Sequence, residues 1–237
     1  ISVPLSASFG QFILKLSQDG YPHLVENEAA HLHASRSLGL SVSEGQLVRD
    51  RSGETGLLVR RFDRARTHKG WQRLAFEDAT QIMNLPPANK YTVDAESAIS
   101  SLASTTAAPV IAAHNLYLQF VFAWLTGNGD LHAKNIGVLR SVKGMWSIAP
   151  IYDIPCTLIY DDDSMALPIN GRTRKLRSRD WEAFEESIGL RPRAAARARA
   201  LAVRAASALD WTALPFSGSP LHRVERELRR RRDELVK

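Results

Sequence analysis

The stretch GNGDLHAKNIGVL, residues 127–139, decides how the rest of the chain is interpreted. It places Asp130 and Asn135 in a loop after an apolar segment, and the run IAPIYDI, residues 148–154, then places Asp153 among apolar residues. Magnesium takes oxygen ligands, typically one or two side-chain oxygens together with waters and phosphates. We therefore expect Asn135 and Asp153 to supply metal ligands and Asp130 to accept a proton from an attacking hydroxyl. This division of roles suits phosphoryl transfer.

The order of these residues follows the protein-kinase signature, in which a catalytic Asp precedes a metal-binding Asn by five positions and a second Asp follows. Lys15 ends an early strand-like run and precedes a helix-like segment with Glu26 and Glu28, which is typical of the Lys–Glu pair that orients ATP phosphates. Each feature also has an ordinary explanation: Asp130 could serve turn chemistry and Lys15 could be a strand-edge charge. Asp153 is different, because a carboxylate among apolar residues costs several kcal/mol unless it is paired or holds a metal.

Composition indicates a globular protein. The chain has 237 residues, of which 44% are apolar, and this suits one large domain or two packed lobes. Its longest apolar runs are about ten residues, too short to cross a bilayer. The start ISVPLSAS lacks a secretory pattern. It also lacks Met, so we expect a trimmed chain. A single cysteine, Cys156, rules out a disulfide framework within the chain and fits a reducing cytoplasm. Its apolar surroundings predict a core residue and not a nucleophile.

The positive charge is concentrated near the C-terminus. Net charge is +6, and much of it lies in residues 191–204 and 222–237, which both have helical periodicity. The ordinary interpretation is two solvated Arg faces, and the alternative is a surface that binds nucleic acid. No zinc-ligand spacing and no aromatic RNA-binding motif narrows this choice.

Local patterns predict a strand-rich beginning followed by a mainly helical chain. Residues 10–21 read as a strand and a turn, 26–38 as a helix ended by Gly39, and 43–64 as two strands around a turn at 51–53. Helices are then expected in 76–87, in part of 93–108, before Gly127, in 180–190 and in both basic segments, with a hairpin turning at 142–144.

Several stretches together resemble the HipA-type serine/threonine kinases, the toxin components of bacterial toxin–antitoxin systems. The matching segments, besides the two loops quoted first, are FILKL (12–16), NEAAHLHASRSLGL (27–40), LLVRRFDR (57–64), RLAFEDATQIMNLPPANKY (73–91) and LPINGR (167–172). The combination is specific, although no single segment is.

The resemblance implies a protein-kinase-like two-lobe α+β fold. Residues 1–64 would form a small strand-rich, ATP-binding lobe, and residues 65–237 a mainly helical lobe with the catalytic loop. It implies Asp130 as the catalytic base and Asn135 and Asp153 as magnesium ligands. ATP contacts are expected from Lys15, Phe62, Asp63 and His132; the ordinary role of this histidine is a packed or hydrogen-bonded imidazole, so we do not expect it on the metal.

The resemblance also implies partners. Family members phosphorylate Ser or Thr on proteins such as aminoacyl-tRNA synthetases, and a small helix-turn-helix antitoxin of the HipB kind, which binds operator DNA, neutralises them. We expect a cytoplasmic protein that meets DNA through its antitoxin and does not bind membranes. Three departures stand out: no Gly-rich loop is visible in residues 1–10, Arg60 stands where the family often has Glu, and the small N-terminal subdomain of full-length members has no counterpart here.

Two other functions remain open from the residues. GDLHAKN, residues 129–135, is similar to the GD-H-x-x-N loop of small-molecule kinases of the aminoglycoside and choline phosphotransferase kind, although RFDR and LPINGR favour the HipA interpretation. A non-catalytic scaffold that binds an antitoxin, and DNA through it, would suit the Arg-rich helices. Arg226 and Arg230 would share one helix face there. We expect catalysis and partner binding together, because the whole set of kinase residues is present.

Overall fold

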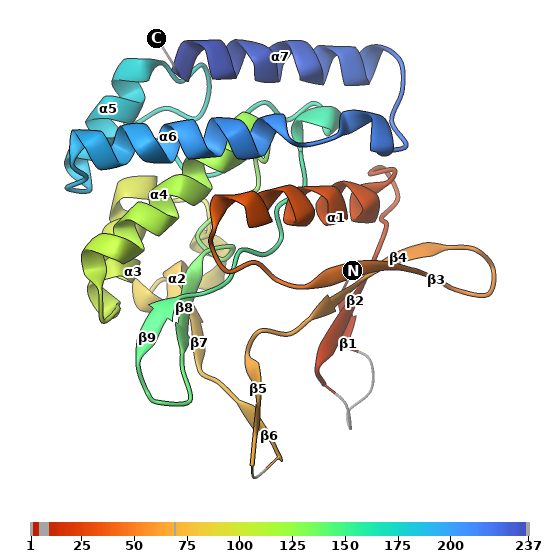
Figure 1. The fold of residues 1–237 in the computed structure, drawn as a ribbon, viewed down its shortest axis with the longest axis horizontal. Helices are drawn as coiled ribbons and strands as arrows, with labels where there is room; N and C mark the ends of the chain where they lie inside the picture. The colour runs from red at the N-terminus through yellow and green to blue at the C-terminus, as the bar shows by residue number, and fades with distance from the viewer. Residues whose placement is uncertain (1, 5–9, 69, 236–237) are drawn as a thin grey trace.

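The chain folds into a strand-rich part and a stack of helices (Figure 1). The computed structural model describes residues 2–4, 10–68 and 70–235. An antiparallel four-stranded sheet in the order β1-β2-β4-β3 forms the first part. Its strands are β1 (Ser2–Pro4), β2 (Phe12–Leu16), β3 (Gly45–Arg49) and β4 (Thr55–Arg60). The Gly-rich loop that was sought before β2 would fall largely on residues 5–9, which lie outside the described part of the chain.

Helix α1 (Leu24–Ser35) packs on this sheet, against β3 and β4. Buried side chains such as Val25 and Leu32 on the helix and Leu57 on β4 join the two elements, and burial of apolar surface of this kind is the main stabilising contribution. A short 3₁₀ helix (Arg36–Leu38) continues α1 to Gly39, whose φ of 68° is the left-handed conformation that glycine adopts readily. The predicted strand, helix and hairpin of this region are confirmed.

The structure differs from the sequence-based expectation at two places in residues 64–87. A second hairpin, β5 (Arg64–Thr67) with β6 (Gly70–Arg73), follows where the chain was expected to become helical. The short helix expected in 76–87 is present but shorter, as α2 (Ala79–Ile82), because β7 (Phe76–Asp78) pairs with a later strand that local periodicity cannot reveal.

The remaining helices form layers over the sheets (Figure 1). They are α3 (Ala95–Thr105), α4 (Pro109–Thr126), α5 (Ser178–Ser187), α6 (Pro192–Ser207) and α7 (Ser219–Leu235), with 3₁₀ helices at Pro87–Asn89, Leu158–Tyr160 and Trp211–Ala213. The apolar α4 is buried over most of its length and ends at Gly127 with φ 71°, as predicted. None of the helices in the described residues has the length and apolarity needed to cross a membrane.

A three-stranded sheet β7-β8-β9 carries the chain toward Asp153. The predicted hairpin is confirmed as β8 (Gly137–Arg140) and β9 (Trp146–Ile148). Asp153, however, lies beyond β9 in an irregular segment, so its expected place inside a strand-like run is wrong. The Ile151 backbone bonds with Ser41 and Ser43 anchor this segment next to the end of α1.

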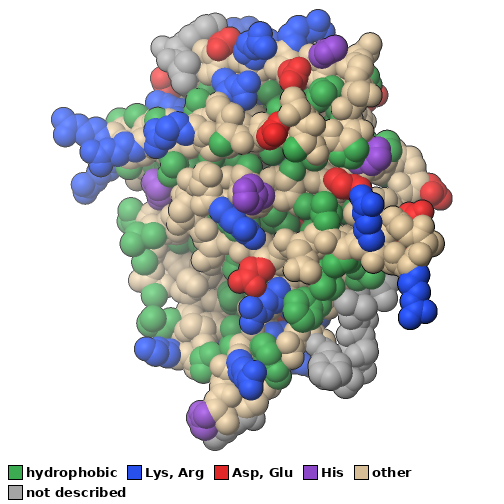
Figure 2. Space-filling model, turned by 45° about the vertical axis from the view of Figure 1, so that its right-hand side comes forward, with side chains coloured by type: hydrophobic (Ala, Val, Ile, Leu, Met, Phe, Trp, Pro, Cys, Tyr) green, Lys and Arg blue, Asp and Glu red, His purple; other side chains and the backbone are tan. Residues whose placement is uncertain are grey.

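The basic C-terminal segments are helices, as expected. The small residues Ala195, Ala198 and Ala202 of α6 are buried, which lets this helix pack closely on α4. In the face drawn in Figure 2, Lys and Arg side chains project at the upper and left edges, with acidic side chains between them. One arginine differs from the expected solvated Arg faces. Arg231 of α7 is buried and lies over the ring of Trp124, with its guanidinium carbon 3.7 Å from the ring centroid.

Candidate active site

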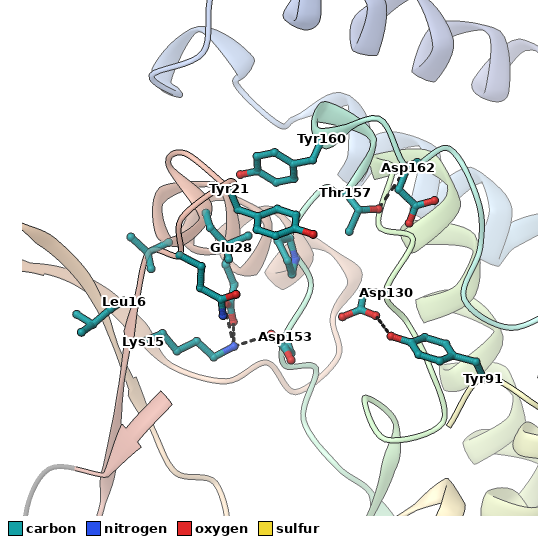
Figure 3. Close-up of a pocket in the computed structure, with 14 residues that line it drawn as sticks. Lys15, Leu16, Tyr21, Glu28, Tyr91, Asp130, Asp153, Thr157, Tyr160 and Asp162 are labelled. Carbon is teal, nitrogen blue, oxygen red and sulfur yellow. Dashed lines mark hydrogen bonds and ion pairs between the residues drawn. The ribbon is translucent and has the colours of Figure 1, made fainter. Parts of the chain in front are cut away.

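A cavity of about 650 Å³ lies where β2, α1 and the loops that carry Asp130 and Asp153 meet (Figure 3). It brings Lys15 together with Asp130 and Asp153, which follow it by more than a hundred positions in the sequence. The other lining residues are Leu16, Gln18, Tyr21, Leu24, Val25, Glu28, Tyr91, Pro155, Thr157, Tyr160 and Asp162. The cavity is therefore polar on the side of the three predicted site residues and partly aromatic elsewhere.

Lys15 is the centre of an ion-pair cluster. Its Nζ lies 2.7 and 2.8 Å from the two carboxylate oxygens of Glu28 and 2.6 Å from Oδ1 of Asp153. Of the two glutamates considered from the sequence, α1 therefore presents Glu28, and not Glu26, to the lysine. The cluster joins the sheet, α1 and the segment after β9 through a single ammonium group (Figure 3).

Burial and charge act in opposite directions on this cluster. Burial lowers the pKa of Lys15, but the charges of Glu28 and Asp153 outweigh it, so the pKa of the ammonium is raised above its usual value. Burial raises the pKa of Glu28 to about 7, although the charge of Lys15 opposes that rise. The lysine consequently keeps its positive charge throughout the physiological range.

Asp153 is held in an unusual backbone conformation. Its φ is 54°, in the left-handed region that non-glycine residues seldom occupy and that is common at functional sites. Three residues later, the backbone N–H and C=O of Cys156 bond to the side chain of Asn27, the residue before Glu28. The Asp153 side chain is 40% exposed, so the cost of a buried carboxylate expected from the sequence does not arise here.

The loop that carries Asp130 is held by its own asparagines. The Oδ1 of Asn128 accepts a bond from the Asp130 N–H at 2.8 Å, and Nδ2 of Asn135 donates to the Asp130 carbonyl oxygen at 2.8 Å. Gly129 is needed between them, because an added Cβ would lie 2.6 Å from both Thr157 Oγ1 and an Asp162 carboxylate oxygen. Asp130 thus has a defined backbone and a half-exposed carboxylate facing the cavity.

His132 lies beside Asp130 but is not among the residues that line the cavity. Its Nε2 is 2.9 Å from Lys90 Nζ and 3.8 Å from Asp130 Oδ1. Burial lowers the pKa of His132, and the positive charge of Lys90 lowers it further while Asp130 opposes the shift. A hydrogen-bonded imidazole is the ordinary role that we expect for His132 from the sequence.

Phe62 and Asp63 are also outside the cavity lining. Phe62 packs against Phe76 and Tyr152, with ring centroids 5.3 and 5.4 Å away. Asp63 bonds to the guanidinium groups of Arg61 and Arg64. Their expected contacts with a nucleotide stay predictions, and the contacts that the structure does form are packing and ion pairing.

The donor set fits magnesium bound partly by phosphates. Asn135 donates through Nδ2 to the Asp130 carbonyl, which leaves its Oδ1 unused by that bond, but Asn135 is buried and is not among the residues that line the cavity. Asp153 uses Oδ1 for Lys15, which leaves the second carboxylate oxygen for a cation. Within the described residues, no group of three or more His, Cys, Asp and Glu side chains could hold a metal ion. Magnesium with few protein ligands is compatible with this arrangement.

Several cavity residues were not found from the sequence. Tyr91 donates a hydrogen bond to Asp130 Oδ1 at 2.9 Å, and Thr157 accepts one from the Gly129 N–H at 2.7 Å. Tyr21 and Tyr160 form an edge-to-face pair with centroids 5.2 Å apart. The run Asp161–Asp163 was the one available signal, and it does not indicate which carboxylate faces the cavity.

Cys156 is buried with its pKa raised by burial to about 12, as expected of a core thiol.

Comparison with known proteins identifies the family of this chain. The profile of the family described as the HipA-like C-terminal domain matches residues 3–209. The chain belongs to this family. A relative from Sinorhizobium fredii, Y4mE, is 29% identical over 199 residues, covering 80% of this chain and 47% of the relative. The serine/threonine-protein kinase toxin HipA of Shewanella oneidensis is 28% identical over 191 residues, covering 72% and 43%.

Two solved structures share the fold of this HipA-like chain. HipA in the Shewanella oneidensis complex with HipB and operator DNA matches with a TM-score of 0.80 and 23% identity, over 95% of this chain and 58% of that one. The Helicobacter pylori proinflammatory kinase CtkA matches with a TM-score of 0.61 and 16% identity, over 95% and 84%. The fold is therefore kinase-like α+β, as expected. The chain spans about half the length (43–51%) of the curated relatives that it matches.

Proposed function

We propose that this HipA-like chain carries the ATP- and magnesium-dependent kinase site of a serine/threonine protein kinase. The observation that carries the proposal is the contact of Lys15 with both Glu28 and Asp153 in a cavity that Asp130 also lines. A lysine placed between a helix glutamate and a metal-binding aspartate is the arrangement by which kinases orient ATP phosphates. We further propose that the strand-rich lobe ends near residue 64 and that ATP binds between the lobes.

Each polar residue has a distinct role in the proposed transfer. Lys15 binds phosphate oxygens of ATP, and Glu28 keeps the lysine side chain in place. Asp130 orients the acceptor hydroxyl and accepts its proton as the hydroxyl oxygen attacks the γ-phosphorus and ADP leaves. Phe62, Asp63 and His132 are proposed as neighbours of the nucleotide that act through packing and hydrogen bonding, since their observed partners are protein groups.

Asn135 and Asp153 are the proposed magnesium ligands. Their available oxygens and the absence of a larger carboxylate cluster in the described residues suit an ion that shares its coordination with phosphates. The bound ion would supply positive charge against the phosphate oxygens. The chain's own contribution is to hold both ligand segments in place, through the Asn135–Asp130 and Asn27–Cys156 bonds.

Partners are proposed from the relatives. The Shewanella oneidensis structure contains HipB and operator DNA, which supports a HipB-like helix-turn-helix antitoxin and indirect contact with DNA in the cytoplasm. Protein substrates of the aminoacyl-tRNA synthetase kind are proposed from the HipA resemblance. Arg226 and Arg230 are exposed on α7 and could face antitoxin or the DNA backbone. Unchanged operator affinity of the toxin–antitoxin complex after R226E plus R230E would exclude that surface.

The first test is transfer of labelled phosphate from ATP in a bacterial lysate that contains tRNA. The protein is compared with Asp130→Ala and Asp153→Ala, with nucleotide binding measured in parallel. We expect a labelled protein band that both variants lose, with magnesium-dependent ATP binding retained in the first and weakened in the second. Full activity of both variants would refute the site. Label found only in small molecules would favour a small-molecule phosphotransferase, and no Asp130-dependent label would favour a binding module.

A further inference from the structure

The Tyr91 hydroxyl is hydrogen-bonded to Asp130, the proposed catalytic base. Its hydroxyl donates to Asp130 Oδ1 at 2.9 Å (Figure 3), which is the type of bond that an acceptor hydroxyl makes with a base before giving up its proton. Tyr91 belongs to the segment after the 3₁₀ helix Pro87–Asn89, far from the catalytic loop in sequence. The contact therefore forms only in the folded chain.

The tyrosine ring is held in this position by the catalytic loop and its neighbour. The His132 ring meets it edge-on with a centroid distance of 5.1 Å, and Lys90 Nζ lies 4.7 Å from its centroid. Lys90 in turn contacts His132, so the ring rests against a connected pair of side chains. Tyr91 is nevertheless 49% exposed and lines the cavity, so a bound molecule can reach it and move it.

The hydroxyl acts as a proton donor and not as a base. Burial, together with the bond to Asp130 and its charge, raises the pKa of Tyr91 to about 12. At neutral pH the group is protonated, so its bond keeps one proton-accepting oxygen of Asp130 engaged.

We propose that Tyr91 caps Asp130 and selects protein hydroxyls over water as phosphoryl acceptors. A protein that docks in the cavity gains contacts that can offset the loss of the Tyr91 bond, and its own hydroxyl then takes the place of the tyrosine at Oδ1. A water molecule makes no such contacts, so nothing offsets the loss of the Tyr91 bond when water approaches Asp130 Oδ1. This inference rests on the proposed kinase function, in which the acceptor proton passes to Asp130.

The size of the effect follows from the bond that is removed. A hydrogen bond to a charged group corresponds to about a tenfold factor or more in an equilibrium. Tyr91→Phe keeps the ring and its contacts but leaves Oδ1 open. We therefore expect ATP hydrolysis without a protein acceptor to rise about tenfold, while a merely structural role for Tyr91 would lower every activity.

The test measures ADP release by the full chain with magnesium and ATP, with and without casein as a generic Ser/Thr acceptor. Tyr117→Phe is the matched control, because it also removes a tyrosine–carboxylate bond, to Glu185, but within the helical core. We expect faster acceptor-free hydrolysis in Tyr91→Phe alone, and no gain when Asp130→Asn is added.

Three outcomes would overturn the cap. If Tyr91→Phe labels casein but hydrolyses ATP no faster than the wild type, the cap is refuted while the kinase function stands. Phosphate found on Tyr91 by mass spectrometry would make the residue an acceptor and not a cap. If no variant consumes ATP, the kinase function and the cap fail together. A further check needs no ATP: the pKa of Tyr91, followed by NMR, should fall in Asp130→Asn because the carboxylate charge is removed while the burial stays, and an unchanged value would refute the contact.

Discussion

Asn27 joins helix α1 to the segment that follows Asp153, and its removal should be costly. The side chain is fully buried, its Nδ2 donates to the Cys156 carbonyl at 2.9 Å, and its Oδ1 accepts from the Cys156 N–H at 2.9 Å. Asn27→Ala removes both bonds at once. The substitution leaves the backbone N–H and C=O of the buried Cys156 without their Asn27 partners.

The expected loss can be worked from those two groups. A buried polar group left unsatisfied costs about 1–3 kcal/mol, so two groups give about 2–5 kcal/mol after allowance for partial solvation. In a chain of this size each kcal/mol lowers Tm by roughly 2–4 °C. We therefore expect Tm to fall by about 4–20 °C.

Urea denaturation followed by tryptophan fluorescence measures the change in the free energy of unfolding. Asn115→Ala is a matched control on α4, because Asn115 is only partly buried and its Oδ1 lies 3.3 Å from a His114 ring nitrogen; it should cost less than about 1 kcal/mol. Since Asn27 precedes Glu28 and Cys156 follows Asp153 by three positions, Asn27→Ala should also weaken magnesium-dependent ATP binding. A loss below about 1 kcal/mol with unchanged ATP affinity would refute the reasoning.

Three further predictions concern a buried histidine, a buried arginine and a crowded glycine. Burial lowers the pKa of His31 from 6.5 to about 4, so the unfolded chain binds a proton that the folded chain excludes. The free energy of unfolding should therefore fall by about 3 kcal/mol as pH drops from 6.5 to 4. His31→Gln should remove this pH dependence in denaturation experiments. Arg231→Met loses the contact with Trp124 and the bonds to Glu227 and two backbone carbonyls; it should cost about 3–5 kcal/mol by urea denaturation, whereas the exposed Arg230→Met should cost under about 1 kcal/mol. Gly129→Ala would place a Cβ within 2.7 Å of three oxygen atoms; it should displace the Asp130 loop and lower phosphate transfer at least tenfold, and transfer at the wild-type rate would contradict the crowding.

The main elements were predictable where local signals are strong. Gly39 and Gly127 end their helices in the left-handed conformation, and the turn near Gly53 joins two strands, as the sequence indicated. Residues 64–73 and 76–78 were not recognised as strands, because short strands are stabilised by a partner chain segment and not by their own periodicity.

The candidate site was predictable in its residue types and less so in its contacts. The spacing of Asp130 and Asn135 and the later Asp153 indicated phosphoryl-transfer chemistry, and the structure brings Asp130 and Asp153 to one cavity with Lys15. The choice of Glu28 over Glu26 needed the direction in which α1 presents each side chain. Tyr91 ends the matching segment 73–91, but nothing in that segment indicates its contact with Asp130, because the hydrogen bond spans 39 positions.

The sequence by itself determined the family, the order of the helices and strands in most of the chain, and the chemical types available for catalysis. These follow from local periodicity, turn residues and motif spacing, which are properties of neighbouring positions. The tertiary structure decided which groups share a charge or a proton: Lys15 with Glu28 and Asp153, Tyr91 with Asp130, and Asn27 with Cys156. Hydrogen bonds and ion pairs act over about 3 Å in space, so contacts between distant parts of the chain exist only once the sheet, α1 and the loops that carry Asp130 and Asp153 have packed together.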